Sequence, residues 1–236
     1  MANEGFNLNR LYEDSKKALL QPKAYFSSLP IEGGLGEPIL KALVYGVIAG
    51  IFVLIWSLLN VSGFSGGIFG SAMGIAGFFW SILGAVIGVF IGGLVVLIIS
   101  AICGGNTEFE PNMRVAAAIM VLLPINAFLG FFDGINFALG SVISLLVNLY
   151  GIYMLYWAVR GVLNAKEQSA RILSYVLAAL MVLFLIIGLA TRSAVQRATG
   201  WNEDKVKEMM KEYEDEMEDA KQKMEEVEEE MEEQGQ

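Results

Sequence analysis

Cysteine and histidine, which carry much of the nucleophilic and metal chemistry of proteins, are almost absent from this 236-residue chain. It contains no histidine and one cysteine, Cys103. Zinc sites, haem sites and nucleophiles activated by an imidazole therefore lack a complete set of residues. A lone cysteine also forms no disulfide within the chain. We expect no catalytic residues, no metal site and no cofactor, and we interpret Cys103 as a small packing residue rather than a lipidation site.

The long apolar stretches of the chain contain no charged residue in their interiors. Ionisable side chains inside a membrane are the usual sign of an ion or proton pathway, so this pattern argues against a charge-coupled transporter. The polar side chains in these stretches are neutral, and they include Asn60, Asn126, Asn148, Ser141, Ser144, Tyr150, Tyr153 and Tyr156. The three tyrosines and Trp157 are typical of an interfacial aromatic belt, with a ligand pocket as the alternative.

The elements that hold these residues are membrane spans. Residues 42–107 contain no charged side chain, and a soluble domain could not run for 66 residues without a solvated face. About 20 apolar residues cross the hydrocarbon core, so this run alone predicts at least two spans. Only 17% of the chain is charged, whereas soluble proteins have about a quarter of their residues charged.

We predict an all-α, polytopic membrane helical bundle in three parts. Residues 1–38 form a cytosolic preface with an amphipathic helix, residues 39–191 form the membrane domain, and residues 192–236 form an acidic helical tail. The five predicted spans are residues 39–61, 78–103, 113–130, 137–159 and 172–191. Pro124 should kink or unwind the third span. The glycine-rich segment 63–77 is either a re-entrant turn or a sixth crossing.

Lysine and arginine in short loops indicate which side of the membrane each loop occupies. With five spans and a cytoplasmic N-terminus, nine of these residues lie inside and two, Arg192 and Arg197, lie outside. This count favours five spans over six and predicts an extracytoplasmic C-terminus. Apolar residues recur at helical spacing from Leu8 to Leu19, among basic ones. This amphipathic helix lies either on an anionic leaflet or against the protein itself.

Glycines spaced four residues apart predict close helix packing. Gly46 and Gly50 form one such pair, and Gly84, Gly88 and Gly92 form a longer row. Small residues at this spacing let helix backbones approach each other in lipid. We favour packing within the bundle over a homodimer contact.

Acidic residues are concentrated in the tail. From Asn202 onward there are 16 acidic residues and 5 lysines, a net charge of −11, while the remainder of the chain has a net charge of +2. Nothing in this distribution suggests a nucleic-acid partner. Apolar residues recur at alternating spacings of four and three, and we name them the seam: Val206, Met210, Tyr213, Met217, Ala220, Met224, Val227 and Met231. This heptad pattern predicts a parallel homodimer or, because residues 225–233 are mostly glutamate, a single helix that is solvated or docked.

Several short motifs, in order around the predicted spans, give the chain a resemblance to a known family. They are QPKAYF at 21–26, GGNTEF at 104–109 leading into NMRVA at 112–116, and LYGIY at 149–153. The positions that carry the likeness are Pro22, Phe26, Gly104, Gly105, Arg114 and Pro124. In this order the motifs resemble the Yip1-domain family of five-span membrane proteins.

The resemblance implies a cytosolic N-terminus and five spans, and it brings no catalytic residues. Eukaryotic members of the family act in ER–Golgi vesicle traffic and bind Rab GTPases and one another, whereas the bacterial members lack a settled activity. This chain has no long cytosolic N-terminal region and adds an acidic tail. We therefore expect a prokaryotic-type member in the inner membrane, and we do not carry Rab binding over to it.

The sequence favours a non-enzymatic membrane-organising or scaffolding protein. The expected partners are membrane lipids and a second copy of the chain, and the sequence identifies no other protein partner. The alternative is a carrier, channel or lipid-handling protein for a neutral or lipidic substrate, suggested by the charge-free interior and by Pro124.

Overall fold

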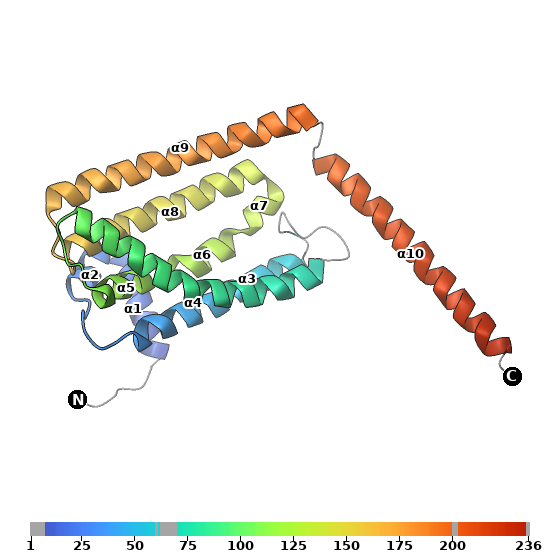
Figure 1. The fold of residues 1–236 in the computed structure, drawn as a ribbon, viewed down its shortest axis with the longest axis horizontal. Helices are drawn as coiled ribbons and strands as arrows, with labels where there is room; N and C mark the ends of the chain where they lie inside the picture. Colours follow the sequence, from blue (N-terminus) through green and yellow to red (C-terminus); the bar gives the residue numbers. More distant parts are fainter. Residues whose placement is uncertain (1–7, 60, 62–69, 200–202, 235–236) are drawn as a thin grey trace.

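The computed structural model describes residues 8–59, 61, 70–199 and 203–234, and every regular element in these ranges is a helix (Figure 1). The helices are α1 (Leu8–Leu20), α2 (Pro22–Ser27), α3 (Gly36–Leu58), α4 (Gly70–Ile102), α5 (Phe109–Ile119), α6 (Leu122–Leu129), α7 (Phe131–Ile135), α8 (Phe137–Arg160), α9 (Glu167–Thr199) and α10 (Glu203–Gln234).

Five segments of the described chain are long and apolar enough to cross a membrane. They are Gly36–Leu58, Gly74–Ile102, Phe109–Ile135, Phe137–Arg160 and Glu167–Ala194. The predicted all-α membrane bundle is therefore confirmed. The first span begins earlier than predicted because Pro38 fits the first turn of a helix, where its missing N–H needs no partner. Residues 63–69 of the glycine-rich segment lie outside the described residues, and Gly70–Gly77 forms the start of α4.

The third span is broken between α5 and α6, at Met120 and Val121. Pro124 explains the position of the break, because its ring clashes with the carbonyl of residue 120 and it has no N–H to donate to that carbonyl. The indole Nε1 of Trp56 donates to the carbonyl of Ala127 at 3.0 Å, which holds α6 against α3. The break thus interrupts the helix of the third span without detaching its second half from α3.

Two of the predicted packing glycines bring α3 and α4 into backbone contact. A Cβ atom at Gly46 would lie 2.7 Å from the Cβ of Ala85, and one at Gly50 would lie 2.8 Å from a ring carbon of Phe78. The hydroxyl of Ser81 donates to the Gly46 carbonyl at 3.1 Å. A larger residue at either glycine would push the two helices apart.

The row of glycines on α4 is used only in part. Gly92 faces Ala116 of α5, with 3.3 Å between its Cβ position and the Ala116 Cβ, and Gly88 has Met120 at 3.9 Å. Gly84 has no neighbour within 4 Å of its Cβ position among the described residues. Gly84 therefore lies on a face of α4 that no described helix covers, and for this glycine the alternative of a contact between two chains stays a prediction.

The two N-terminal helices pack against one end of the bundle (Figure 1). α1 buries Leu11 and Ala18, and the hydroxyl of Tyr150 on α8 donates to the Leu19 carbonyl. α2 buries Pro22 and Phe26. The face of α1 that carries Leu11 and Ala18 thus lies against the protein.

The acidic tail forms the helix α10, which extends away from the other helices (Figure 1). Its apolar seam is exposed to solvent at Tyr213, Met217, Ala220 and Met224, and Met210 is half-buried. The side chains of Val206, Val227 and Met231 lie outside the described part of the tail. Over the residues described, no other part of the single chain therefore packs against the exposed positions of the seam.

Candidate functional site

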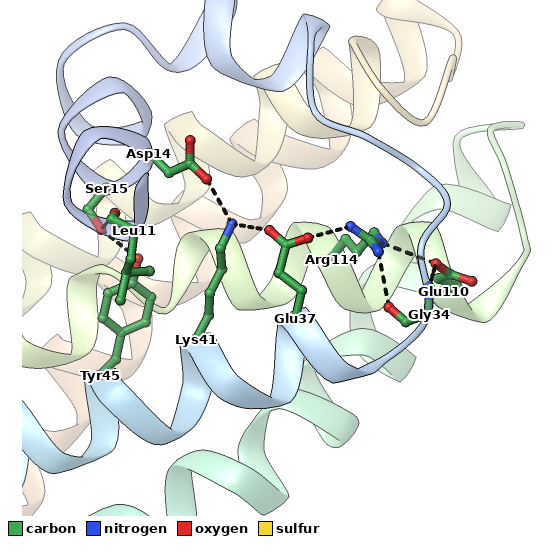
Figure 2. A network of polar contacts seen from close by, with 9 residues as sticks. All are labelled: Leu11, Asp14, Ser15, Gly34, Glu37, Lys41, Tyr45, Glu110 and Arg114. Carbon is green, nitrogen blue, oxygen red and sulfur yellow. Dashed lines mark hydrogen bonds and ion pairs between the residues drawn. The ribbon is translucent and has the colours of Figure 1, made fainter. Parts of the chain in front are cut away.

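The most distinctive polar feature of the bundle is a buried ion-pair network at the end where α1 and α2 pack. It consists of Asp14, Glu37, Lys41, Glu110 and Arg114, which come from α1, α3 and α5 (Figure 2). Charged side chains are buried only where they are paired, because leaving water costs each of them several kcal/mol. The burial of these charges therefore depends on their pairing, and the geometry of the pairs shows which helices the network holds together.

Arg114 is the centre of one half of the network and is only 5% exposed. Its Nη1 donates to Glu37 Oε2 at 3.0 Å, and its Nε donates to Glu110 Oε1 at 3.2 Å. Its Nη2 donates to the Gly34 carbonyl at 3.0 Å, and the Gly34 N–H donates to Glu110 at 2.6 Å. One guanidinium thus fastens α3, α5 and the segment before α3 to each other.

Glycine is required in the segment that Arg114 binds. Gly33 and Gly34 have φ angles of +130° and +84°, which other residues rarely adopt. A Cβ atom at Gly33 would also lie 2.6 Å from the Nη2 of Arg114. Both the backbone and the available space at Gly33 therefore exclude a side chain.

Lys41 is the centre of the other half and is 6% exposed. Its Nζ lies 2.9 Å from Glu37 Oε1 and 3.2 Å from Asp14 Oδ2. Glu37 therefore contributes one oxygen to Lys41 and the other to Arg114, and it joins the two halves. Through Asp14 the network reaches α1 and holds that helix against α3.

A second polar contact between α1 and α3 lies beside the network. The Ser15 hydroxyl donates to the Leu11 carbonyl at 2.6 Å, and it lies 2.7 Å from the Tyr45 hydroxyl. Because the Ser15 proton is already used, Tyr45 must be the donor in the second bond. Nearby, burial raises the pKa of Tyr25 to about 12, partly opposed by the charge of Lys41.

The chemistry of this site is that of a clamp. Each carboxylate accepts from a cation, and Glu110 also accepts from a backbone amide. Among the residues that the structure describes, no group of three or more His, Cys, Asp or Glu could hold a metal ion. The network has three carboxylates and two cations, a net charge of −1, and each of its charged groups is paired with one of opposite sign.

The glycine motif after α4 forms a second clamp at the same end. The N–H of Asn106 donates to the Leu163 carbonyl at 2.8 Å, and the N–H of Lys166 donates to the Cys103 carbonyl at 3.0 Å. A Cβ atom at Gly105 would lie 2.7 Å from that Leu163 carbonyl, so only glycine fits. Gly104 has a φ of +71°. The loop between α4 and α5 is thereby locked onto the loop between α8 and α9.

Asn112 completes this second clamp from α5. Its side-chain amide is fully buried and donates to the carbonyls of Asn106 and Glu108, at 3.0 and 2.7 Å. The hydroxyl of Ser100 also donates to the Asn106 carbonyl, at 2.7 Å. The motif that runs from Gly104 to Arg114 therefore supplies both clamps.

The remaining residues singled out from the sequence lie elsewhere. Pro22 occupies the first position of α2, and the backbone of Phe26 faces Gly161 after α8, with 3.2 Å between the Phe26 carbonyl and the Gly161 Cβ position. Pro124 is in the first turn of α6, far along the third span from Arg114. The structure brings Gly104, Gly105, Pro22, Phe26 and Arg114 to one end of the bundle.

Sequence reasoning missed four members of the ion-pair network, namely Asp14, Glu37, Lys41 and Glu110. A signal was present, because Glu37 and Lys41, and Glu110 and Arg114, are spaced i, i+4 at the starts of two spans, the spacing of a helical ion pair. The contact of Glu37 with both Lys41 and Arg114 could not be predicted in this way, because it depends on how α3 and α5 pack.

A comparison with known protein families matches residues 16–188 to the Yip1 domain model. No curated protein and no solved structure matches the chain. The matched region contains the five candidate spans except the end of the last one, both clamps except Asp14, and none of α10.

Proposed function

Because this chain belongs to the Yip1-domain family, we propose that it is a non-enzymatic membrane-organising protein that self-associates through its acidic tail. It is an integral membrane protein of this family, with five segments of the described chain able to span a membrane. The buried charged residues of the described bundle, Lys41 and Arg114, hold its helices together. The helix α10 extends away from the bundle, and we place the partner contact on it.

The observation that carries this proposal is the exposed seam of α10. Tyr213 and Met224 are 65% and 66% exposed, and Met217 lies between them on the same helix face. Burying such side chains on a partner is favourable, at about 25 cal/mol per Å² of apolar area. A seam that repeats every seven residues fits a second helix of the same kind.

The charges that flank the seam favour a parallel pair of identical helices. With Met210 at heptad position a, Glu216 of one chain would face Lys221 of the other, and Lys223 would face Glu228. In the single chain, Lys223 pairs with Asp219 of its own helix at 2.7 Å. Because that contact is exposed, exchanging it for an interchain contact costs little.

We place the clamped end of the bundle in the cytoplasm, which puts α10 on the outer side of a prokaryotic inner membrane. The distribution of lysine and arginine supports this orientation. Nine of these residues lie at or near the clamped end, and Arg192 and Arg197 lie near the other end of the last span. A reporter enzyme fused after residue 236 tests it directly. Activity of a periplasmic reporter supports the orientation, and activity of a cytoplasmic reporter contradicts it.

The proposal of self-association is tested by light scattering of the purified chain in detergent. Removal of residues 202–236 should lower the oligomeric order, because the seam is lost. The sharper variant is Met217→Glu, which puts a charge into the seam and should have the same effect. Gln222→Glu is the matched control, because it adds the same charge on the opposite face of the helix and should leave the mass unchanged.

A charge exchange tests the parallel arrangement. Lys223→Glu should weaken association, since two glutamates would then face each other across the pair. Adding Glu228→Lys should restore it, because the interchain pair is rebuilt with its signs reversed. An unchanged mass in the truncated chain, or equal effects of Met217→Glu and Gln222→Glu, would show that the tail is a lone helix.

The alternative, a carrier or lipid-handling protein, rests on the break between α5 and α6. A passage would also need space inside the bundle. A cavity between α4, α8 and α9, lined by Cys103, Tyr156 and Ser174 among others, holds about 10 Å³, about the minimum for one water molecule. The described part of the bundle therefore favours the organising role.

A further inference from the structure

A group of basic and aromatic side chains gathers where α2, the end of α8 and the start of α9 meet. Trp157 is at its centre, with Tyr153 and Tyr156 in edge-on ring contact at centroid distances of 6.3 and 5.1 Å. The Nζ of Lys23 lies 5.2 Å from the centre of the Trp157 indole, and the Cζ of Arg160 lies 5.6 Å from it. Two cations from separate segments thus converge on one ring.

The positive charge of this group is only partly neutralised. Glu167 accepts from Arg160 at 2.7 Å and from Arg171 at 2.6 Å, so one carboxylate serves two guanidinium groups. The Lys23 ammonium lies within ion-pair distance of no carboxylate among the described residues. Three cations against one anion leave a net charge of +2 in a small region.

The position of the group in the fold indicates what would neutralise that charge. Arg160 ends one candidate span and Glu167 begins the next, so the group lies at the membrane boundary. Beside it, Tyr153, Ile172 and Tyr175 are exposed on the faces of α8 and α9 that would meet acyl chains. Aromatic rings prefer this depth in a bilayer, and basic groups between helices at this depth bind anionic head groups.

We propose that Lys23, Arg160 and Trp157 form a binding site for the phosphate of an anionic phospholipid, with its acyl chains along α8 and α9. The two cations hold the phosphodiester, and the indole fixes their positions by cation–π contact. The lipid would link α2 to the loop between α8 and α9, in addition to the two clamps. This site does not depend on self-association through α10.

Native mass spectrometry of the full chain in detergent, with equal amounts of phosphatidylglycerol and phosphatidylcholine of the same acyl chains, tests the site. The protein should retain phosphatidylglycerol in preference to phosphatidylcholine. Each cation near an anionic lipid contributes about a fivefold change in affinity. Lys23→Gln and Arg160→Gln should therefore each lower the ratio of the two bound lipids about fivefold.

Lys17→Gln is the matched control, because Lys17 is an exposed lysine at the same end of the bundle. It should leave the ratio unchanged, and an equal loss in this variant would overturn the proposal in favour of general surface charge. If Arg160→Gln fails to fold because Glu167 loses a partner, Lys23→Gln decides alone, since Lys23 is exposed.

The source of the phosphate is tested with inorganic phosphate. Excess inorganic phosphate should leave phosphatidylglycerol bound, because the acyl chains contribute to affinity. Displacement by inorganic phosphate would show a site for a free anion and would overturn the lipid assignment, as would equal retention of the two lipids. Neither result depends on the oligomeric state of the protein, so this test and the test of self-association fail separately.

Discussion

Replacement of Arg114 by glutamine is the most direct test of the ion-pair clamp. Arg114 is almost fully buried and donates to Glu37, Glu110 and Gly34. The variant leaves Glu37 with Lys41 alone and leaves Glu110 without a cation. Removing one partner of a buried ion pair costs about 3–5 kcal/mol. Because about a third of each carboxylate is exposed, with side-chain exposures of 38% and 32%, we expect the lower end, about 3 kcal/mol.

Two measurements follow from this magnitude. For a chain of this size, 1 kcal/mol shifts the melting temperature by roughly 2–4 °C, so Arg114→Gln should lower it by roughly 6–12 °C. Hydrogen exchange then shows where the stability is lost. The segment around Gly34 and the start of α3 should exchange on the order of a hundredfold faster, since every 1.4 kcal/mol is a factor of ten.

Arg171→Gln is the control, because it makes the same chemical change at an arginine whose side chain is 56% exposed and pairs with Glu167. An exposed ion pair contributes about 0–1 kcal/mol, so the melting temperature should fall by a few degrees at most. Equal shifts in the two variants would refute the reasoning, because they would show that burial of Arg114 adds nothing to its ion pairs.

Three further outcomes follow from the structure. Gly105→Ala should destabilise the chain by about 1–3 kcal/mol in thermal unfolding, because the new Cβ meets the Leu163 carbonyl; Gly84→Ala, which meets nothing within 4 Å, should not. Cys103 is buried, and burial raises the pKa of its thiol, so maleimide should label it only after denaturation in SDS; labelling of the folded chain would contradict its placement. Burial raises the pKa of Tyr25 to about 12, above the value of about 10 in an unfolded chain. The stability that depends on its neutral form is therefore intact below pH 10 and lost as the pH rises towards 12, and the tyrosinate absorbance of wild type minus Tyr25→Phe should show this late titration.

The membrane fold could be predicted because each span carries its own signal. The charge-free run from 42 to 107 requires lipid, and the basic loops favour two crossings in it. The ends of the helices were less predictable. α9 continues to Thr199, past the predicted end at residue 191, because a helix can extend into water once its apolar segment ends. The break before Pro124 was predictable because it follows from the geometry of one residue.

The clamps were predictable only in part. Arg114 and the Gly104–Gly105 pair could be singled out as a motif, but the contacts that give them a role come from other elements. Lys41 looks like the edge of an apolar run in the sequence, and only the packing of α1 on α3 brings Asp14 to it. Gly84 shows what spacing alone leaves open, since it matches the packing row of Gly88 and Gly92 while no described helix lies within 4 Å of its Cβ position.

The shared carboxylate of Glu37 has a thermodynamic consequence for the whole end of the bundle. Its two oxygens hold Lys41, which anchors α1, and Arg114, which anchors the segment at Gly34. The stabilities of these two attachments cannot be independent, because a rotation of Glu37 that favours one cation weakens the other. In a double-mutant cycle, Asp14→Asn and Glu110→Gln should show an interaction energy although the two residues do not touch. The N-terminal helix and the entry to the first span would then open and close as one cooperative unit.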